Sequence, residues 1–294
     1  MSRKPAVTIV GPGSLGGALA MALHAAGYAV PEIVYHQDQV RASALAKRVG
    51  AKAIALEQFE PSGQLMWICV PDAQISQIGA SMARSGTWNG KTVFHSSGAL
   101  TSEELGPFSW KGAAIASVHP MMSFVRGSTA KFKGVAFALE GNAGAMKMAA
   151  QIAKDLGGTS FELKKEDKPL YHALGAFSSP MMMALFAAAE RIGRELGLSA
   201  EQTREVTGPI LRKTLENYLQ LGSAGSLSGP LTRGDAMTVR RNLEALVRVP
   251  GAAEIYKALA RVAVEDLPVK NQVDLKKALS VRKPAGKKRK RASA

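Results

Sequence analysis

The chain has 294 residues, 46% of them hydrophobic, and a formal net charge of +15 at pH 7. Because one domain typically spans about 100–200 residues, we expect two domains. The hydrophobic content excludes a largely disordered chain. The single cysteine, Cys69, excludes a disulfide framework and a multi-cysteine zinc site, so we predict no metal centre. It also fits a reducing, cytoplasmic location.

The positive charge is concentrated at the C-terminus. Seven basic residues and no acid lie within residues 282–294, which leaves 15 − 7 = +8 for the rest of the chain. Like charges at this density repel one another, so we predict a disordered basic tail over 281–294. The tail is either simply solvated or a contact for nucleic acid or another acidic surface.

Neither a secretory signal nor a membrane span is expected. Four glycines (Gly11, Gly13, Gly16 and Gly17) cut the first apolar stretch. The charge-free run Ala173–Ala189 is near the lower length limit for a span and contains Ser178, Ser179 and Pro180. We interpret it as a helix buried between subunits.

The first half alternates short apolar runs with helical patterns, which predicts a doubly wound parallel sheet with helices on both faces. Strands are expected at 6–10, 32–35, 52–55, 65–70, 92–95, 114–118, 135–139 and 159–163. Helices are expected at 15–26, 40–49, 73–84 and 143–156, with a short helical turn at 102–105.

Beyond residue 164 the pattern is helical throughout. Helices are predicted at 168–196, 200–221, 235–247 and 252–266. We therefore divide the chain into a sheet domain (1–164), a helical substrate and dimerisation domain (165–280) and the tail (281–294).

A glycine-rich loop follows the first predicted strand. Its sequence, Gly11-Pro12-Gly13-Ser14-Leu15-Gly16, is a GxGxxG pattern between a strand and a helix, which is typical of dinucleotide binding. The first glycine permits a tight turn, the second lets a pyrophosphate approach the backbone, and the third lets the helix pack closely on the strand. We expect the amides of Ser14 and Leu15 to face the phosphates. The alternative is a turn that only packs.

The end of the second strand bears on the choice of cofactor. An acid usually stands there and binds the ribose 2′-OH of NAD. Here the strand ends in Tyr35-His36-Gln37, with Asp38 and Arg41 beyond it. A missing carboxylate and a nearby His36 or Arg41 favour NADP, although NAD stays possible. Both residues could instead be ordinary surface side chains.

Three more strand ends carry polar or turn-forming residues, and ligands bind open α/β sheets at this edge. Val70 and Pro71 end the fourth strand, close to the expected ribose and nicotinamide. His95 and Ser96 end the fifth, with Ser97 beside them as a substrate contact. His119 follows the sixth. Alternatively, Ser96 and Ser97 cap the turn that follows them.

The first helix of the second half carries four residues at helical spacing. Lys168, His172, Gly175 and Ser179 fall at i, i+4, i+7 and i+11, on one face. We predict that His172 is the acid/base group, that Ser179 orients the substrate and that Lys168 is a solvated first-turn residue. A structural histidine is the other interpretation of His172. Pro180 is expected to kink this helix after Ala176.

A later loop, Leu227–Asp235, contains a candidate anchor for a carboxylate. Arg233 could grip such a group through two hydrogen bonds. It could instead form an ion pair with Glu205 or Asp235. Asp235 is expected to cap the following helix.

Four segments together resemble a known family: the Gly11–Gly16 loop, His95–Ala99, Tyr171–Ala173 and Gly229–Asp235. The chain is similar to Rossmann-like proteins whose C-terminal half is the domain of unknown function 2520. These are related to pyrroline-5-carboxylate reductases and deazaflavin-dependent NADP oxidoreductases. The resemblance implies an oxidoreductase that dimerises through its helical domain. Pro180 and Asn242 stand where the family usually has Asn and His.

The sequence thus predicts a cytoplasmic NADP-dependent oxidoreductase. It would transfer hydride between the cofactor and a small C=O or C=N substrate, one that bears a carboxylate. His119 is the alternative acid/base group. The segment His119-Pro120-Met121 also resembles prephenate and arogenate dehydrogenases, which gives a second hypothesis. A third is a non-catalytic dinucleotide sensor that uses the basic tail for contact with a partner.

Overall fold

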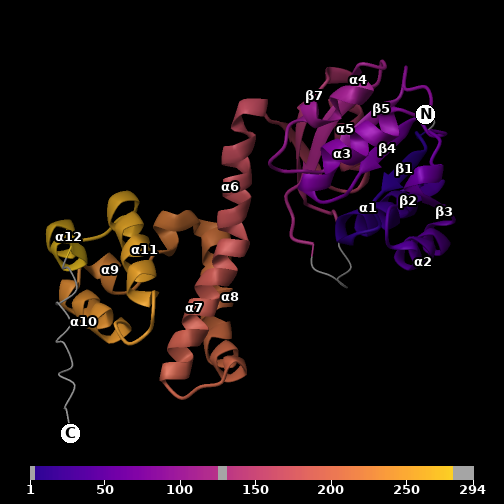
Figure 1. Cartoon of the computed structure of the whole chain (residues 1–294). Helices are drawn as coiled ribbons and strands as arrows, with labels where there is room; N and C mark the ends of the chain where they lie inside the picture. Colours follow the sequence, from indigo (N-terminus) through magenta and orange to yellow (C-terminus); the bar gives the residue numbers. More distant parts are fainter. Residues whose placement is uncertain (1–3, 125–130, 281–294) are drawn as a thin grey trace, which may run out of the picture. The chain divides into compact units, whose positions relative to one another are not determined.

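The computed structural model describes residues 4–124 and 131–280 (Figure 1). The chain divides into two compact units, Met1–Ser179 and Pro180–Ala294. The first unit holds the sheet, the helices that cover it and one further helix after the last strand, and the second unit is helical. The predicted basic tail, 281–294, lies outside the described residues.

The first unit is built on one eight-stranded sheet in the order β3-β2-β1-β4-β5-β6-β7-β8. This is the doubly wound arrangement that the strand–helix alternation predicted. The strands are β1 (Val7–Val10), β2 (Glu32–Tyr35), β3 (Lys52–Ala55), β4 (Leu65–Ile68), β5 (Thr92–His95), β6 (Ala114–Pro120), β7 (Ala136–Gly141) and β8 (Thr159–Glu162).

Helices cover both faces of this sheet, each over its own apolar core. One face packs against α1 (Ser14–Ala25), α2 (Gln39–Val49) and α5 (Ala143–Asp155). The other packs against α3 (Asp72–Ala83), the 3₁₀ turn η2 (Ser102–Leu105) and the short helix α4 (Gly106–Ser109), which the sequence did not predict. Both strand faces are therefore buried, which explains why β1 and β4 consist almost entirely of apolar residues.

The sheet is mostly parallel, as predicted, but one of its pairings is antiparallel, so that β7 and β8 run opposite to β1–β6. β7 pairs antiparallel with β6, in the register Ser117↔Glu140 and His119↔Ala138, and β8 pairs parallel with β7. An apolar run indicates that a strand is buried, but it does not encode the direction in which the strand runs. The carboxyl ends of β1, β2, β4, β5 and β6 still meet at one edge.

The helix predicted over 168–196 is two helices, α6 (Lys168–Ser178) and α7 (Pro180–Glu195). Ser179 between them has φ −140° and ψ −80°, outside helical geometry. Pro180 disfavours helical geometry at the residue before it, as anticipated. Among the described residues, Lys165–Glu195 is the one stretch apolar and long enough for a membrane span. Its two helices of 11 and 16 residues are each shorter than the ~20 residues that a span needs.

The second unit continues with five further helices: α8 (Ala200–Ser226), α9 (Pro230–Arg233), α10 (Ala236–Leu246), α11 (Ala252–Asp266) and α12 (Gln272–Ser280). A small core joins α10, α11 and α12, with Val239, Val264 and Leu275 fully or almost fully buried. The sequence analysis missed α9 and α12. Gly222 leaves helical geometry within α8, with φ 70°.

Candidate active site

The three glycines of the loop between β1 and α1 differ in the space around them. Gly11 has φ +99°, and a Cβ there would lie 2.7 Å from the Cys69 carbonyl oxygen. A Cβ on Gly16 would collide with the Gly11 carbonyl oxygen, so the helix packs on the loop at a distance that only glycine allows. Gly13 is open, because a Cβ there would approach only the Cys69 carbonyl oxygen, at 4.0 Å.

The start of α1 is suited to an anion. Gly13 is its N-cap and supplies no side chain to accept a hydrogen bond from the first-turn amides, and that turn contains no acid. These amides and the helix dipole therefore favour a negatively charged ligand. Ser14 and Leu15 are half-buried on this turn. The cradle over Gly13 and the free amides fit the pyrophosphate of a dinucleotide.

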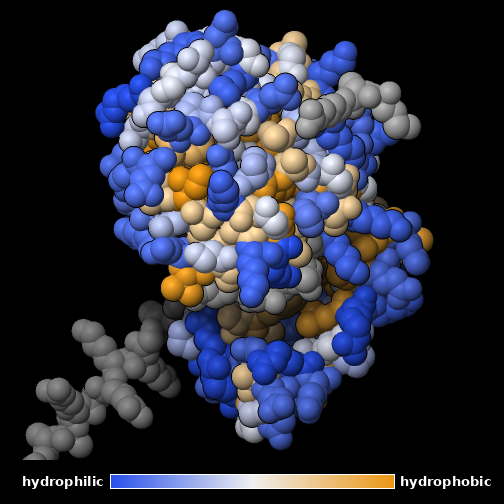
Figure 2. Space-filling model, turned by 90° about the vertical axis from the view of Figure 1, so that its right-hand side faces the viewer, coloured by the Kyte–Doolittle hydropathy of each residue, from blue (hydrophilic) through white to orange (hydrophobic). Residues whose placement is uncertain are grey.

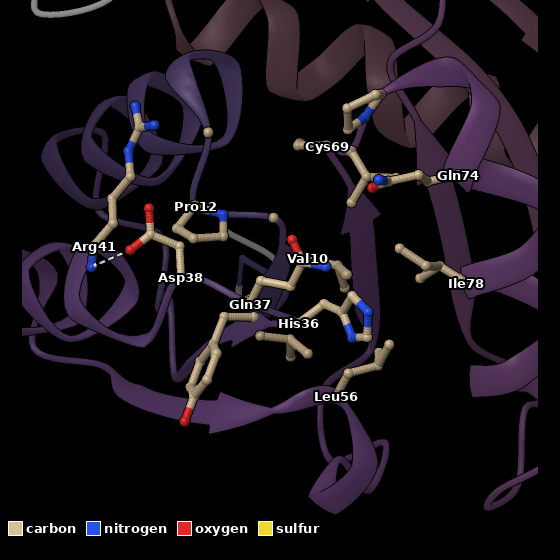
Figure 3. Close-up of a pocket in the computed structure, with 16 residues that line it drawn as sticks. Val10, Pro12, His36, Gln37, Asp38, Arg41, Leu56, Cys69, Gln74 and Ile78 are labelled. Carbon is tan, nitrogen blue, oxygen red and sulfur yellow. Dashed lines mark hydrogen bonds between the residues drawn. The ribbon is translucent and has the colours of Figure 1, made fainter.

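A pocket of about 200 Å³ adjoins the loop (Figure 3). Five of the predicted cofactor residues line it: Gly11, Gly13, His36, Val70 and Pro71. Arg41 and Asp38 lie side by side at one end, and Gln74 and Ile78 lie at the other. The lining thus comes from the carboxyl ends of β1, β2 and β4, where an open α/β sheet binds its ligand.

The charged residues at the end of β2 have distinct partners. Asp38 is the N-cap of α2, and its Oδ1 accepts a hydrogen bond from the Arg41 amide at 2.9 Å. The His36 Nδ1 lies 3.5 Å from the Glu57 Oε1, with both side chains largely exposed. The guanidinium of Arg41 is therefore the cation of this pocket that has no carboxylate within ion-pair distance in the described residues.

The predicted cofactor residues His95 and Ser96 face the protein interior. The His95 ring is fully buried, its Nδ1 accepts from the Ser97 amide at 3.1 Å, and its Nε2 donates to the Thr101 carbonyl at 2.9 Å. Burial lowers the pKa of His95 to about 4, so the ring is neutral. The Ser96 hydroxyl accepts from the Trp67 indole at 2.7 Å. Both side chains hold the loop after β5 in place.

Ser97 organises the same loop from the other side. Its Oγ donates to the Asp72 Oδ2 at 2.8 Å and accepts from the amides of Ala99 and Leu100 at 3.1 and 2.9 Å. This links the start of α3 to the end of β5. Ser97 was predicted as a substrate contact, and the structure shows a capping arrangement in which its hydroxyl already has three partners.

His119, near the end of β6, forms a pair with Tyr171 on α6. The His119 Nδ1 lies 2.7 Å from the Tyr171 hydroxyl, and the rings meet edge-on at 5.5 Å between centroids. Burial and the nearby charges of Lys168 and His172 lower the pKa of His119 to about 4, against a smaller opposing effect of Asp72. Burial raises the pKa of Tyr171 to about 12. A Cβ on Gly98 would lie 2.9 Å from the His119 Nε2, so the ring occupies space that Gly98 leaves free.

Lys168 was expected in solvent, and that expectation was wrong. Its side chain is 1% exposed. The Nζ donates to the Ser117 Oγ at 2.6 Å and to the Ser97 carbonyl at 3.2 Å. Burial lowers the pKa of Lys168 to about 8, although the carboxylates of Glu140 and Asp72 raise it in part.

The first turns of α6 lie along β6, and three successive contacts join them. Lys168 meets Ser117, Tyr171 meets His119, and a Cβ on Gly175 would approach the Met121 sulfur at 3.3 Å. Residues two apart on a strand point to one face, and residues three or four apart share a helix face. The helix therefore completes the edge where β5 and β6 end.

The two other predicted residues near α6 lie differently. His172 is exposed, one residue beyond Tyr171. Ser179 lies at the break after α6, half-buried, and its amide donates to the Ala176 carbonyl at 3.4 Å. The Lys168 and Gly175 positions of the predicted stripe do face β6.

In the second unit, Arg233 ends α9 and is exposed, followed by Gly234 in left-handed geometry. The predicted cap is present, since Asp235 accepts from the Thr238 amide at 2.9 Å. In residues 4–124 and 131–280 no group of three or more His, Cys, Asp or Glu side chains is arranged to hold a metal ion.

Sequence reasoning missed Tyr171, Ser117 and the buried position of Lys168. Tyr171 belongs to a segment that carried the family resemblance, and it follows Lys168 by three residues, which places the two on one helix face. That spacing was the available signal. Nothing local marks Ser117, because a serine within an apolar strand says nothing about its partner 51 residues away.

Two sequence families match the chain. Residues 2–120 match a Rossmann-like domain, and residues 135–263 match the domain of unknown function 2520. No curated protein matches. These two matches confirm the resemblance drawn from the glycine loop and the helical-domain segments.

The fold is similar to several solved structures. A candidate NADP oxidoreductase from Bacteroides fragilis has a TM-score of 0.72 at 19% identity, covering 88% of this chain and 97% of that one. A Thermotoga maritima protein has a TM-score of 0.69 at 24% identity, covering 92% and 98%. The reductive aminase from Aspergillus terreus, in complex with NADPH and ethyl-5-oxohexanoate, has a TM-score of 0.62 at 16% identity, covering 94% and 99%.

Proposed function

The chain carries a Rossmann-like domain followed by the domain of unknown function 2520, and from this premise we propose that it is an NADP-dependent oxidoreductase. The bound cofactor would exchange hydride with a small C=O or C=N substrate. The observation that carries this proposal is the open cradle at Gly13, above an α1 N-terminus whose amides have no side-chain acceptor. The reductive aminase with NADPH, similar in fold, supports it.

The preference for NADP rests on the end of β2. Arg41 lines the pocket and can pair with a 2′-phosphate, whereas the Asp38 carboxylate in the same pocket opposes it. One Asp38 oxygen is already engaged by the Arg41 amide. We therefore assign the 2′-phosphate to Arg41, with His36 at the rim beside Glu57. The imine reductase from Myxococcus stipitatus, another similar structure, is in complex with NADP⁺.

Proton transfer is assigned to the His119–Tyr171 pair. With the pKa of His119 near 4 and that of Tyr171 near 12, the pair is neutral at physiological pH and holds two protons. One proton lies in their mutual hydrogen bond. The other is left either on the His119 Nε2 or on the Tyr171 hydroxyl, according to the tautomer. The pair can thus give one proton to the substrate heteroatom during reduction and accept one during oxidation.

His172 is the second candidate for this role, with Ser179 as an orienting hydroxyl. His172 is exposed and shares α6 with Tyr171. A substrate carboxylate would be held by the exposed Arg233. Ser97 acts on the substrate through the loop that its hydroxyl organises.

We also propose a cytoplasmic homodimer formed through the helical part. Large apolar side chains are exposed along α6 and α8: Leu170 75%, Leu174 59%, Phe177 74%, Val206 68%, Ile210 65% and Leu219 73%. Figure 2 likewise shows hydrophobic atoms at the surface among hydrophilic side chains. On α6, Leu170, Leu174 and Phe177 fall at i, i+4 and i+7, and an exposed apolar stripe of this kind on one helix favours a protein interface. Light scattering on the Leu219→Glu protein should report a smaller particle than the native protein.

Equilibrium dialysis tests cofactor binding, and a substrate screen tests hydride transfer. NADPH should bind more tightly than NADH, and a screen of small imines, ketones and keto acids, prephenate included, should show oxidation of bound NADPH or its reverse. Replacing His119 by Asn should leave cofactor affinity unchanged and lower turnover. If neither cofactor binds at near-millimolar concentration, the proposal fails. If His119→Asn has native turnover and His172→Asn does not, the acid/base role belongs to His172.

A further inference from the structure

The buried lysine of the first unit has no part in the function proposed above. Lys168 is the first residue of α6, and its Nζ donates to a hydroxyl on β6 and to a carbonyl after β5. The described residues place no carboxylate within ion-pair distance of it. A charged group this deeply buried is costly without a direct counter-ion. Simple stability therefore does not account for a lysine here.

What the lysine does account for is the position of the helix. Its two hydrogen bonds join the start of α6 to the ends of β5 and β6. Three residues further on, one helical turn places the Tyr171 hydroxyl 2.7 Å from the His119 Nδ1. Ser117 and His119 lie two apart on β6 and so face the same side. The Lys168–Ser117 contact and the Tyr171–His119 contact are therefore neighbours along the same helix–strand interface.

We propose that Lys168 is a positioning residue: its ammonium ties α6 to β5 and β6 and thereby holds Tyr171 against His119. It acts through the other two residues and is not itself a proton donor. The inference rests on the proposed function in one respect, namely that the His119–Tyr171 pair transfers a proton to or from the substrate. The placement of that pair by Lys168 is independent of any cofactor.

The charge of Lys168 has a second consequence for the pair. The charged or titratable groups that act on His119 are Lys168 and His172 from α6 and Asp72 from α3, and Tyr171 is its hydrogen-bond partner. Those that act on Lys168 are Asp72 and Glu140, with His95 nearby on β5. Burial is the largest cause of the lowered pKa of His119, and the positive charge of Lys168 is the next. The side chain that positions Tyr171 therefore also adds to the preference of His119 for its neutral form.

Histidine NMR on the protein without cofactor provides the test. In Lys168→Met, the midpoint of the His119 titration should rise from about 4 toward the ordinary 6.5. The nitrogen shift of Nδ1 should also lose the signature of its hydrogen bond to Tyr171. The matched control is Lys165→Met, which removes an exposed cation three residues earlier, paired with Glu103 at 2.7 Å. The control should leave both His119 signals unchanged.

Several outcomes decide the proposal. A folded Lys168→Met protein with unchanged His119 signals overturns it, as does an equal change in Lys165→Met. If Lys168→Met does not fold, the native protein still gives an answer through lysine NMR: one ammonium should titrate near pH 8, and lysines that all titrate at their ordinary value of 10.5 refute the buried anchor. Failure to bind NADPH would refute the proposed function and leave these signals untouched.

For turnover, once a substrate is known, Lys168→Met should lower kcat with little change in the KM for NADPH. Lys168→Arg keeps the charge but replaces the compact ammonium by a planar guanidinium with a different hydrogen-bond geometry, so it should restore the low His119 titration midpoint without restoring native kcat. A fall confined to protein stability, with native kcat in both variants, would show that Lys168 serves folding alone and would refute the positioning role.

Discussion

The open position of Gly13 allows cofactor binding to be separated from folding. Gly13 has φ −66° and ψ −171°, which alanine adopts without strain, and a Cβ there meets nothing closer than 4.0 Å. Gly13→Ala should therefore fold, at a cost of about 1 kcal/mol or less because alanine is a poorer N-cap than glycine. The added methyl group projects into the cradle over the α1 amides. Gly11 and Gly16 offer no such separation, since a Cβ at either meets backbone.

The expected loss is in cofactor affinity. Hydrogen bonds to charged groups contribute about 1.5–3 kcal/mol each. Displacing one phosphate contact should therefore weaken NADPH binding roughly 10- to 150-fold. NADH should lose affinity by the same factor, since both cofactors share the pyrophosphate.

The matched control is Gly17→Ala, further along α1, where a Cβ has no neighbour within 4 Å. This variant should bind NADPH normally and gain about 0.5–1 kcal/mol of stability, because glycine is unfavourable within a helix. Calorimetric titration and urea unfolding measure the two quantities. Gly13→Ala protein that binds NADPH as tightly as Gly17→Ala protein would refute the cradle.

Three further predictions concern the pocket and the histidines. Arg41→Ala should weaken NADPH roughly ten-fold, equivalent to about 1.4 kcal/mol, and leave NADH unchanged, with exposed Lys47→Ala on the same helix as the control; equal losses for both cofactors would contradict the 2′-phosphate assignment. Tyr171→Phe should cost about 1 kcal/mol of stability for the lost hydrogen bond and lower turnover, while an unaltered kcat would remove Tyr171 from proton transfer. In the folded state the pKa values of His95 and His119 are lowered to about 4, whereas a histidine of the unfolded chain has its ordinary pKa of 6.5. Between these two pH values the unfolded chain binds more protons than the folded one, so the free energy of unfolding should rise with pH. Urea midpoints that stay flat or fall across that interval would contradict the burial of these rings.

Much of the sheet could be predicted from local sequence. The short segments Glu32–Tyr35 and Thr92–His95 are strands with the expected bounds, because each is largely buried and bounded by polar or turn residues. The glycine loop could also be predicted, because its GxGxxG pattern lies directly between a predicted strand and a predicted helix. The direction of β7 depends on which neighbour it pairs with, and that choice leaves no trace in its own residues.

The candidate site was harder to predict, because its contacts join distant segments. Lys168 resembles an ordinary first-turn lysine, and its partners Ser117 and Ser97 lie 51 and 71 residues earlier. His95 lies at a strand end and is of a residue type that often binds ligands, yet both of its ring nitrogens form hydrogen bonds with the backbone of the loop that follows β5. By contrast, the missed helix α12 did leave a signal: Leu275, Ala278 and Leu279 are buried at helical spacing.

The contact between α6 and β6 constrains the length of the chain that precedes it. From the end of β8 at Glu162, residues 163–167 bring the chain to Lys168. Along an α-helix, each residue rotates the direction of the side chain by about 100° about the helix axis. One residue inserted into this connection would present Asp167, a carboxylate, to the hydroxyl and carbonyl that now receive an ammonium, and would also turn Tyr171 away from His119. Homologous chains that keep this site should therefore vary freely in the sequence of this connector but not in its number of residues.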